Sequence, residues 1–265
     1  MDQLIRTIAL GILQGLTEWL PISSTGHLKI FEKFLGLSVP ILFDVFLHFG
    51  TLAVIIVFFR NDVKGVLEAF LRLDFKKDYG RFVPLIIVGT VPTAIIGLVF
   101  IEFLEGTLQN FLATALAFVA CGIVLCSGKT GKVKADSISF PKAFVIGVAQ
   151  GFAVVPGLSR SGLTVTAALL LGIKPDKAFK FSFFLSIPAI IGALALTLCK
   201  ESGELAASNL GLVEAAAGTV AAFAVGYLAL KLLRRVIMEG KLHFFAFYCW
   251  ALGILLALAL SLGFL

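Results

Sequence analysis

The sequence predicts an all-α protein that crosses a membrane several times and consists of two related halves. Its residues are 59% hydrophobic and only 14% charged, whereas soluble domains are nearer half apolar and a quarter charged. Several runs of about 20 residues carry almost no charge, and this is the length that one helix needs to span a bilayer. The third observation is an internal similarity, which predicts how the spans are arranged.

Two stretches of the chain resemble each other. The first begins at Gly11 and reads GILQGLTEWLPISSTGHL, and the second begins at Gly147 and reads GVAQGFAVVPGLSRSGLT. A shift of about 136 residues aligns their glycines, a glutamine and a serine, so the chain reads as an internal duplication. We expect one integral membrane domain, 1–265, with repeat 1 at about 1–130 and repeat 2 at about 137–265.

Each half is expected to begin with a helix, a polar break and a short return helix. In the first half, residues 3–20 are apolar, the run SSTGH forms the break, and residues 28–37 are too short to span. In the second half, residues 143–155 precede a break at 156–161 and a return helix at 162–173. Non-helical backbone at membrane depth is tolerated only under cover of protein or water, so each unit is expected to be a re-entrant hairpin.

Three full spans are expected to follow each hairpin. They are 41–59, 83–101 and 110–127 in the first half, and about 181–199, 212–232 and 244–263 in the second. Pro92 lies inside the second of these spans and is expected to kink it. The glycines that match between the two stretches are expected to let helices approach one another closely.

The charges of the connecting loops predict the orientation of the chain. The basic loops are 60–82, 128–142, 174–180 and 231–241, and the loops that lean acidic are 102–109 and 200–211. If the chain changes sides at every span but not at the hairpins, all basic loops share one side, which is the cytoplasm. Three spans then separate the hairpins, so the repeats are inverted and both termini lie outside. Paired, interrupted short segments of this kind indicate a site near the membrane midplane.

Arg160 is the residue that points to a phosphate ligand. An arginine within the membrane costs at least about 2.5–3.5 kcal/mol and needs an anionic partner, and a guanidinium suits phosphate oxygens bidentately. Both return helices would aim free N–H groups at the breaks. We therefore expect the substrate-binding residues to be Gln14, Ser23, Thr25, Gly26, Gly157, Ser159, Ser161 and Thr164. The net charge of +6 follows from the basic loops and does not indicate nucleic acid.

Three side chains around the first break could carry the chemistry together with Arg160. The Glu18 carboxylate beside phosphates indicates a divalent metal ion or a general base. Ser24 is a candidate nucleophile that Glu18 or His27 could activate, and His27 is a candidate proton donor or nucleophile. Simpler roles stay open: a structural ion pair of Glu18 with Arg160, a helix cap at Ser24, and a hydrogen-bonded core histidine at His27.

Two other groups of residues have mainly structural interpretations. Asp44 and His48 stand four apart near the start of a span, as a structural pair or as residues that support or give access to the site. The cysteines show no CxxC spacing and lie in or beside apolar runs, as small buried hydrophobes do. They are Cys121, Cys126, Cys199 and Cys249.

These motifs resemble those of a known family. QGLTEWLPISSTGHL is similar to the (E/Q)xxxE segment and following SSTGH of the undecaprenyl-diphosphate phosphatase family, and PGLSRSGLT matches its PGxSRSxxT motif at every fixed position. FKFSFFLSIPAIIGA is similar to the sequence that follows the second motif. The resemblance covers essentially the whole chain.

The resemblance implies an enzyme of the plasma membrane that hydrolyses a polyprenyl diphosphate to the monophosphate and inorganic phosphate with Mg²⁺ or Ca²⁺, recycling the lipid carrier of envelope glycans. Carried over by position, Gln14 and Glu18 form the (E/Q)xxxE pair, and Glu18 becomes the expected metal ligand because Gln14 is neutral. Ser24 and His27 are its catalytic candidates and Arg160 its phosphate-binding residue.

The family resemblance also bears on where the site opens and what the protein contacts. It implies a substrate generated outside, and Lys29 and Lys33 on the first return helix would attract anions there, so we expect the active site to face the outer side. The expected partners are the lipid substrate and membrane lipids, with a homodimer left open. The alternative function is a transporter of a phosphorylated lipid or anion, which would show the same inverted repeat and midplane site.

Overall fold

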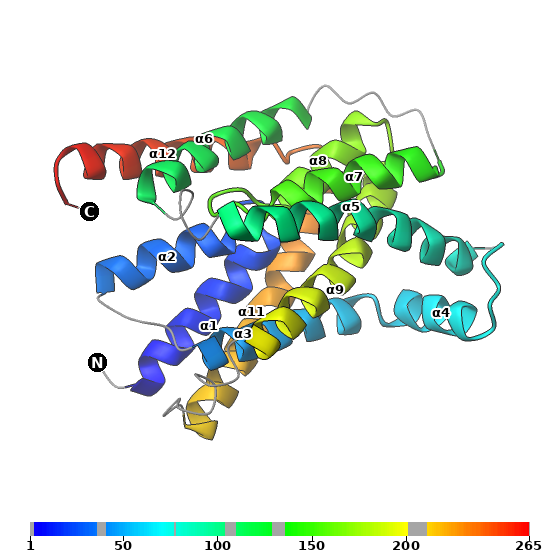
Figure 1. Cartoon of the computed structure of the whole chain (residues 1–265), viewed down its shortest axis with the longest axis horizontal. Helices are drawn as coiled ribbons and strands as arrows, with labels where there is room; N and C mark the ends of the chain where they lie inside the picture. The colour runs from blue at the N-terminus through cyan, green and yellow to red at the C-terminus, as the bar shows by residue number, and fades with distance from the viewer. Residues whose placement is uncertain are drawn as a thin grey trace.

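The structure, a computed structural model, describes residues 3–35, 41–76, 78–103, 110–128, 136–200 and 211–264. Within these ranges every regular element is a helix (Figure 1). In the first half they are α1 (Gln3–Trp19), α2 (Ser24–Leu35), α3 (Ile41–Phe58), α4 (Arg60–Leu71), η1 (Asp78–Arg81), α5 (Phe82–Phe103) and α6 (Phe111–Ser127). In the second half they are α7 (Phe140–Phe152), α8 (Arg160–Leu170), α9 (Pro175–Lys200), α11 (Leu212–Met238) and α12 (Phe244–Ser261).

Four helical segments are long and apolar enough to cross a membrane. They are Tyr79–Phe100, Pro175–Lys200, Leu212–Met238 and Phe244–Ser261, and each overlaps most of one predicted span. α3 and α4 meet at 87° and make a fifth crossing if they form one broken span, while α6 is apolar but has only 17 residues. Together with the hydropathy of the chain, these helices confirm an all-helical, multi-pass membrane protein.

The predicted basic loop at 60–82 is wrong for its first part, because Arg60–Leu71 forms the helix α4. This segment is amphipathic: Val63 and Val66 pack against the main hydrophobic core. Asp62, four residues before Val66 and so on the same face, accepts a hydrogen bond of 2.8 Å from Lys180 of α9. A charged surface segment folds as a helix here because one apolar face has a core to cover.

Both helix–break–helix units are present, but their return helices begin earlier than the sequence pattern predicted. α2 begins at Ser24, so most of the polar run SSTGH forms its first turn, and α8 begins at Arg160. Ser23 precedes α2 with a φ of 69°, and its Oγ accepts a hydrogen bond of 3.3 Å from the Gly26 amide. Ser159 caps α8 in the same way, with 3.2 Å to the Gly162 amide. Capping serines therefore end each break sooner than the apolar pattern suggests.

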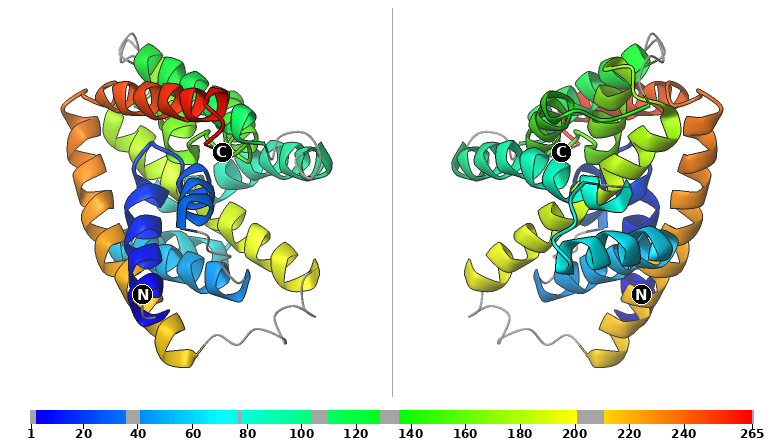
Figure 2. Two further views of the ribbon diagram at one scale, coloured as in Figure 1. Left: turned by 90° about the vertical axis from the view of Figure 1, so that its left-hand side faces the viewer. Right: turned by 90° about the vertical axis from the view of Figure 1, so that its right-hand side faces the viewer.

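Helices from different halves of the chain pack side by side. α1 lies along α11, α7 lies along α5, and α6 lies along α12; Figures 1 and 2 show these pairs from three directions. Glycines allow the first two pairs to come close: a Cβ atom at Gly11 would lie 3.0 Å from the Gly218 Cα, and one at Gly147 would lie 2.7 Å from the Gly89 Cα. Each hairpin is thus held by a span of the other half.

Buried aromatic side chains anchor the end of α1 in the core. Trp19 is fully buried, and its ring centroid lies 5.5 Å from that of Phe183 on α9. This contact fixes Glu18, the preceding residue, near the middle of the molecule. Of the cysteines, Cys121 and Cys249 are buried as predicted, whereas Cys126 and Cys199 are exposed at the surface of the protein.

Candidate active site

The Glu18 carboxylate is the centre of the candidate site. Its Oε2 accepts hydrogen bonds from the Ser24 hydroxyl at 2.6 Å and from the Gln14 amide at 3.1 Å. Its Oε1 forms an ion pair with the guanidinium of Arg160. Only 7% of the Glu18 side chain and 19% of the Arg160 side chain are exposed. Four residues that the sequence singled out therefore meet in one buried group.

The helices place these four side chains for simple geometric reasons. Gln14 and Glu18 are four residues apart on α1 and so lie on one face. Ser24 is the first residue of α2, just across the break, and Arg160 is the first residue of α8. The ion pair of Glu18 with Arg160, one of the alternatives from the sequence, is formed, and it joins the two hairpins. A membrane-buried arginine receives the anionic partner that it needs.

The two breaks are also joined through Ser23. Its Oγ accepts a hydrogen bond of 3.0 Å from the amide of Gly157, in addition to the bond from Gly26. Gly157 has a φ of +102°, and a Cβ atom there would lie 2.8 Å from the Ala117 Cβ. Only glycine fits both that conformation and that contact with α6. Ser23 and Gly157 therefore form the joint between the hairpins.

His27 and Thr25 lie outside the bonded group around Glu18. The His27 Nδ1 is 2.7 Å from the carbonyl oxygen of Ser23, and its Nε2 is 2.7 Å from the hydroxyl of Tyr248 on α12. The Thr25 side chain, in the first turn of α2, is exposed at the surface of the protein. The sequence did not point to Tyr248, because it belongs to an apolar span more than two hundred residues away.

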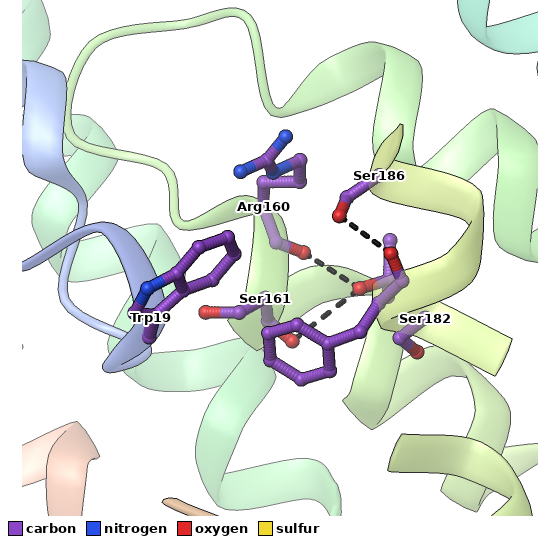
Figure 3. A pocket seen from close by; sticks show the side chains of 7 residues that line it. Trp19, Arg160, Ser161, Ser182 and Ser186 are labelled. Atoms are coloured by element: carbon purple, nitrogen blue, oxygen red, sulfur yellow. Dashed lines mark hydrogen bonds between the residues drawn. The ribbon is translucent and has the colours of Figure 1, made fainter. Parts of the chain in front are cut away.

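A small pocket of about 10 Å³, room for about one water molecule, lies beside Arg160 (Figure 3). It is lined by Trp19, Arg160, Ser161, Thr164, Ser182, Phe183 and Ser186. The buried Ser182 hydroxyl has no hydrogen-bond partner among the described residues, and the Ser186 hydroxyl donates to the Phe183 carbonyl at 2.7 Å. The predicted residues Ser161 and Thr164 thus face two further hydroxyls. Ser182 and Ser186 could have been found from their spacing of four within an apolar span.

Asp44 and His48 pair with each other near the same centre. The His48 Nδ1 lies 3.5 Å from the Asp44 Oδ1 and 2.9 Å from the Asp44 carbonyl oxygen. The structural pair suggested by their spacing is therefore present.

The residues around Glu18 can contribute to a divalent cation site but do not complete one. In the part of the chain that the structure describes, no group of three His, Cys, Asp or Glu side chains is placed to hold a metal ion. The buried Oε1 of Gln14 has no hydrogen-bond partner there, and Glu18 supplies a carboxylate beside it. Mg²⁺ commonly binds one or two protein oxygens and takes its other ligands from water and substrate phosphates. The two side chains fit that mode of binding.

Comparison with known proteins agrees with the motifs. Residues 7–255 match the family described as "Bacitracin resistance protein BacA". A protein of Carboxydothermus hydrogenoformans is 38% identical over 265 residues, covering 97% of this chain and 98% of its own. One of Syntrophotalea carbinolica is 40% identical over 256 residues, covering 94% and 96%. One of Halothermothrix orenii is 38% identical over 258 residues, covering 96% and 97%.

All three relatives carry the name undecaprenyl-diphosphatase. The family indicated by the two sequence motifs is thereby confirmed, and the match extends over both hairpins and all the helices that join them. With its membrane spans and its buried centre of Gln14, Glu18, Ser24 and Arg160, this chain belongs to the BacA family of bacitracin resistance proteins.

Proposed function

We propose that this protein hydrolyses undecaprenyl diphosphate to the monophosphate and inorganic phosphate, as the names of its relatives state for them. The observation that carries the proposal is the hydrogen bond of 2.6 Å between the Ser24 hydroxyl and a Glu18 carboxylate that also pairs with Arg160. It combines a nucleophile, a base and a phosphate-binding cation in one buried place.

Arg160 is the residue that would bind the terminal phosphate. A phosphate group takes the place of the Glu18 carboxylate on the guanidinium, where it can be held by two parallel hydrogen bonds. The N-terminus of α8 adds free amide groups at the same position. Ser161, Thr164 and Ser182 line the pocket beside it, and the Ser182 hydroxyl, unpartnered among the described residues, can donate to a bound water. Glu18 is then free to act on Ser24.

Ser24 is the nucleophile that the geometry favours over His27, because both ring nitrogens of His27 bond to other groups. Glu18 takes the proton as the Ser24 Oγ bonds to the terminal phosphorus, and the bond from that phosphorus to the bridging oxygen breaks. The lipid monophosphate leaves with the electron pair. Water then attacks the phosphoserine, inorganic phosphate carries away both hydrogens of the water, and the proton on Glu18 returns to Oγ.

A divalent cation fits this proposal through Gln14 and Glu18. The unpartnered Gln14 Oε1 and the Glu18 carboxylate are the two oxygen donors that would hold it. When bound, such a cation supplies positive charge that offsets the charge of a diphosphate. The residues of the chain perform the proton transfer and the attack.

We also propose that the chain is an inverted repeat, with halves at about 1–130 and 137–265. The support comes from equivalent contacts: α1 packs on α11 as α7 packs on α5, and Ser23 caps α2 as Ser159 caps α8. Both chain ends lie on the left in Figure 1, while α4 and the start of α7 lie on the right. An odd number of crossings between the two hairpins accounts for this arrangement. With the basic loops in the cytoplasm, the α1–α2 hairpin enters from the outer face of the plasma membrane, and the site opens to that face.

Phosphate release by the purified protein tests the proposed activity. The protein is reconstituted and given undecaprenyl diphosphate or shorter polyprenyl diphosphates, with and without a metal chelator. We expect release of inorganic phosphate from the wild-type protein, loss of release in Ser24→Ala, and a reduced rate with chelator. Recovery of intact substrate that has moved across the vesicle membrane would instead support the transporter. A Ser24→Ala variant with wild-type turnover would rule out the covalent mechanism.

A further inference from the structure

The hydrogen bonds of His27 determine which of its nitrogens carries a hydrogen. The Nδ1 lies 2.7 Å from the carbonyl oxygen of Ser23, which can only accept a hydrogen bond. The Nδ1 is therefore the donor. In the neutral ring the Nε2 then has the lone pair, and it accepts a hydrogen bond from the Tyr248 hydroxyl at 2.7 Å. This is a specific tautomer held from two sides.

The aromatic ring of Tyr248 also contacts the His27 imidazole, in addition to the hydrogen bond from its hydroxyl. The two rings are stacked with centroids 5.7 Å apart and planes at 10°. Phe118 of α6 meets the imidazole edge-on at 5.5 Å and 89°. His27 is thus enclosed between α6 and α12, two helices of different halves that lie along each other.

His27 is hydrogen-bonded to Ser23, the residue that joins the two hairpins. The Ser23 carbonyl that binds the His27 Nδ1 belongs to the residue whose Oγ binds the Gly157 amide. Ser24 is the next residue along the chain. In the other tautomer the Nδ1 lone pair would face the Ser23 carbonyl, and the two would repel each other. The Ser23 carbonyl also accepts a hydrogen bond from the His27 backbone amide at 3.2 Å, and the hydrogen on Nδ1 adds a second bond that holds its orientation.

We propose that Tyr248 is a positioning residue for the phosphatase reaction: its hydroxyl fixes His27 in the Nδ1–H tautomer, and His27 thereby holds the backbone that presents Ser24. This inference rests on the proposed function and extends it to α12. It assigns the hydroxyl of Tyr248 a role that the stacked ring alone cannot supply. Tyr248→Phe keeps the ring and removes only that hydroxyl, so it separates the two contributions.

The first measurement is ¹⁵N NMR of protein labelled at its three histidines, His27, His48 and His243. In the wild type we expect a protonated Nδ1 and a hydrogen-bonded, unprotonated Nε2 for His27. In Tyr248→Phe the Nε2 signal of His27 should shift, whereas the signals of the other two histidines should stay as an internal control of the fold. A His27 Nε2 that carries the hydrogen, or that does not respond to the substitution, overturns the proposal.

The second measurement is the rate of phosphate release. Loss of one hydrogen bond of a positioning residue should lower kcat about 3–10-fold in Tyr248→Phe. KM should change less than about twofold, because the proposed role gives Tyr248 no contact with the substrate. The same substitution in a His27→Phe background should cause no further loss, since the hydroxyl then has no nitrogen to bind. An equal loss in both backgrounds, or none in either, overturns the positioning role.

Tyr227→Phe is the matched control. Tyr227 is exposed to a similar degree, 37% against 45% for Tyr248, and packs against Phe58 at 5.7 Å. Its substitution should change neither kcat nor the His27 signals. If the wild-type protein releases no phosphate, the proposed function fails and the positioning role falls with it, while the ¹⁵N signals still decide whether the contact of Tyr248 with His27 exists.

Discussion

Glu18 carries a negative charge into the apolar centre of the molecule, and three other side chains make this favourable. Arg160 supplies the opposite charge, while Ser24 and Gln14 donate hydrogen bonds to the second carboxylate oxygen. A buried carboxylate with fewer partners would cost several kcal/mol. The same partners are the groups that a phosphate and a nucleophile need, so the stability of the centre and its proposed chemistry depend on the same atoms.

Arg160 offers the first prediction at the scale of single residues. Arg160→Lys keeps the positive charge but loses the planar fork, so it should lower phosphate release at least about tenfold. Arg160→Ala should lower it by about a thousandfold or more, because an anion-binding group is lost altogether. Both rates are measured with undecaprenyl diphosphate on protein that elutes as a single species.

The matched control is Arg235→Lys, at an exposed arginine that pairs with Glu239 at 2.8 Å. It should leave turnover unchanged. Arg160→Ala also leaves the buried Glu18 carboxylate without its opposite charge, so the thermal unfolding of this variant in detergent is compared with that of the wild type beside its turnover. Turnover near the wild-type level in Arg160→Lys would contradict bidentate binding of the phosphate.

At the scale of helices, glycine contacts hold each hairpin against a span of the other half. Gly147 of α7 lies against Gly89 of α5 so closely that the Thr93 hydroxyl bonds to both of their carbonyl oxygens, at 2.9 and 2.8 Å. Gln150, one turn on from Gly147, donates to Thr93 at 3.3 Å and to the Leu185 carbonyl at 3.1 Å. These bonds fix the depth of α7, and with it the position at which α8 and Arg160 begin.

Gly147→Ala tests this arrangement. The added methyl group would lie 2.7 Å from the Gly89 Cα, a backbone atom that cannot turn away. The helices must separate, and we expect a loss of about 1–3 kcal/mol in stability, measured as thermal unfolding in detergent. Phosphate release should also fall, because the start of α8 moves with α7.

Gly97→Ala is the control on the same pair of helices. A Cβ atom at Gly97 of α5 has no neighbour within 4 Å in the described structure. Removing the flexibility of a helical glycine should stabilise the protein by about 0.4–1 kcal/mol. Equal stability of the two variants would contradict close packing of α5 on α7.

At the scale of the whole molecule, the question is the side of the membrane to which the site opens. The α1–α2 hairpin carries Ser24, Lys29 and Lys33, and in the proposed orientation it enters from outside. Thr25 is exposed on the first turn of α2, next to Ser24. Its side chain therefore reports the access of water to the site.

A cysteine at Thr25 tests the orientation in intact cells. Cys126 and Cys199 are exposed and are first replaced by serine, while the buried Cys121 and Cys249 can remain. We expect Thr25→Cys to react with an impermeant thiol reagent added outside, and a diphosphate analogue to slow that reaction. Ser137→Cys is the control: Ser137 is exposed in a segment expected to be cytoplasmic, so it should react only in inverted vesicles. The reverse pattern would place the site on the inner face.

The sequence alone determined that this protein lies in a membrane, that it contains two helix hairpins, and which chemical groups form its candidate active site. These properties are local: apolar runs of span length, prolines and polar residues that interrupt them, and an arginine that cannot remain unpaired among apolar residues. Arg160 is predicted as a site residue for that reason, and Glu18 because its carboxylate stands beside the first polar break. The helix α4 was missed because the charges of residues 60–71 conceal an apolar face that only the core defines.

Tertiary structure decided how the candidate residues divide into groups. Ser24 and His27 stand three apart on α2 and look equivalent in the sequence, yet Ser24 bonds to Glu18 while His27 bonds to Ser23 and Tyr248. That choice depends on α12, which is folded back onto the first hairpin, and on side-chain orientations that periodicity does not encode. Ser182 and Ser186 line the pocket beside Arg160 for the same reason, through packing of α8 on α9. Hydrophobic pattern fixes which segments are buried, and the contacts between distant segments fix which polar groups meet there.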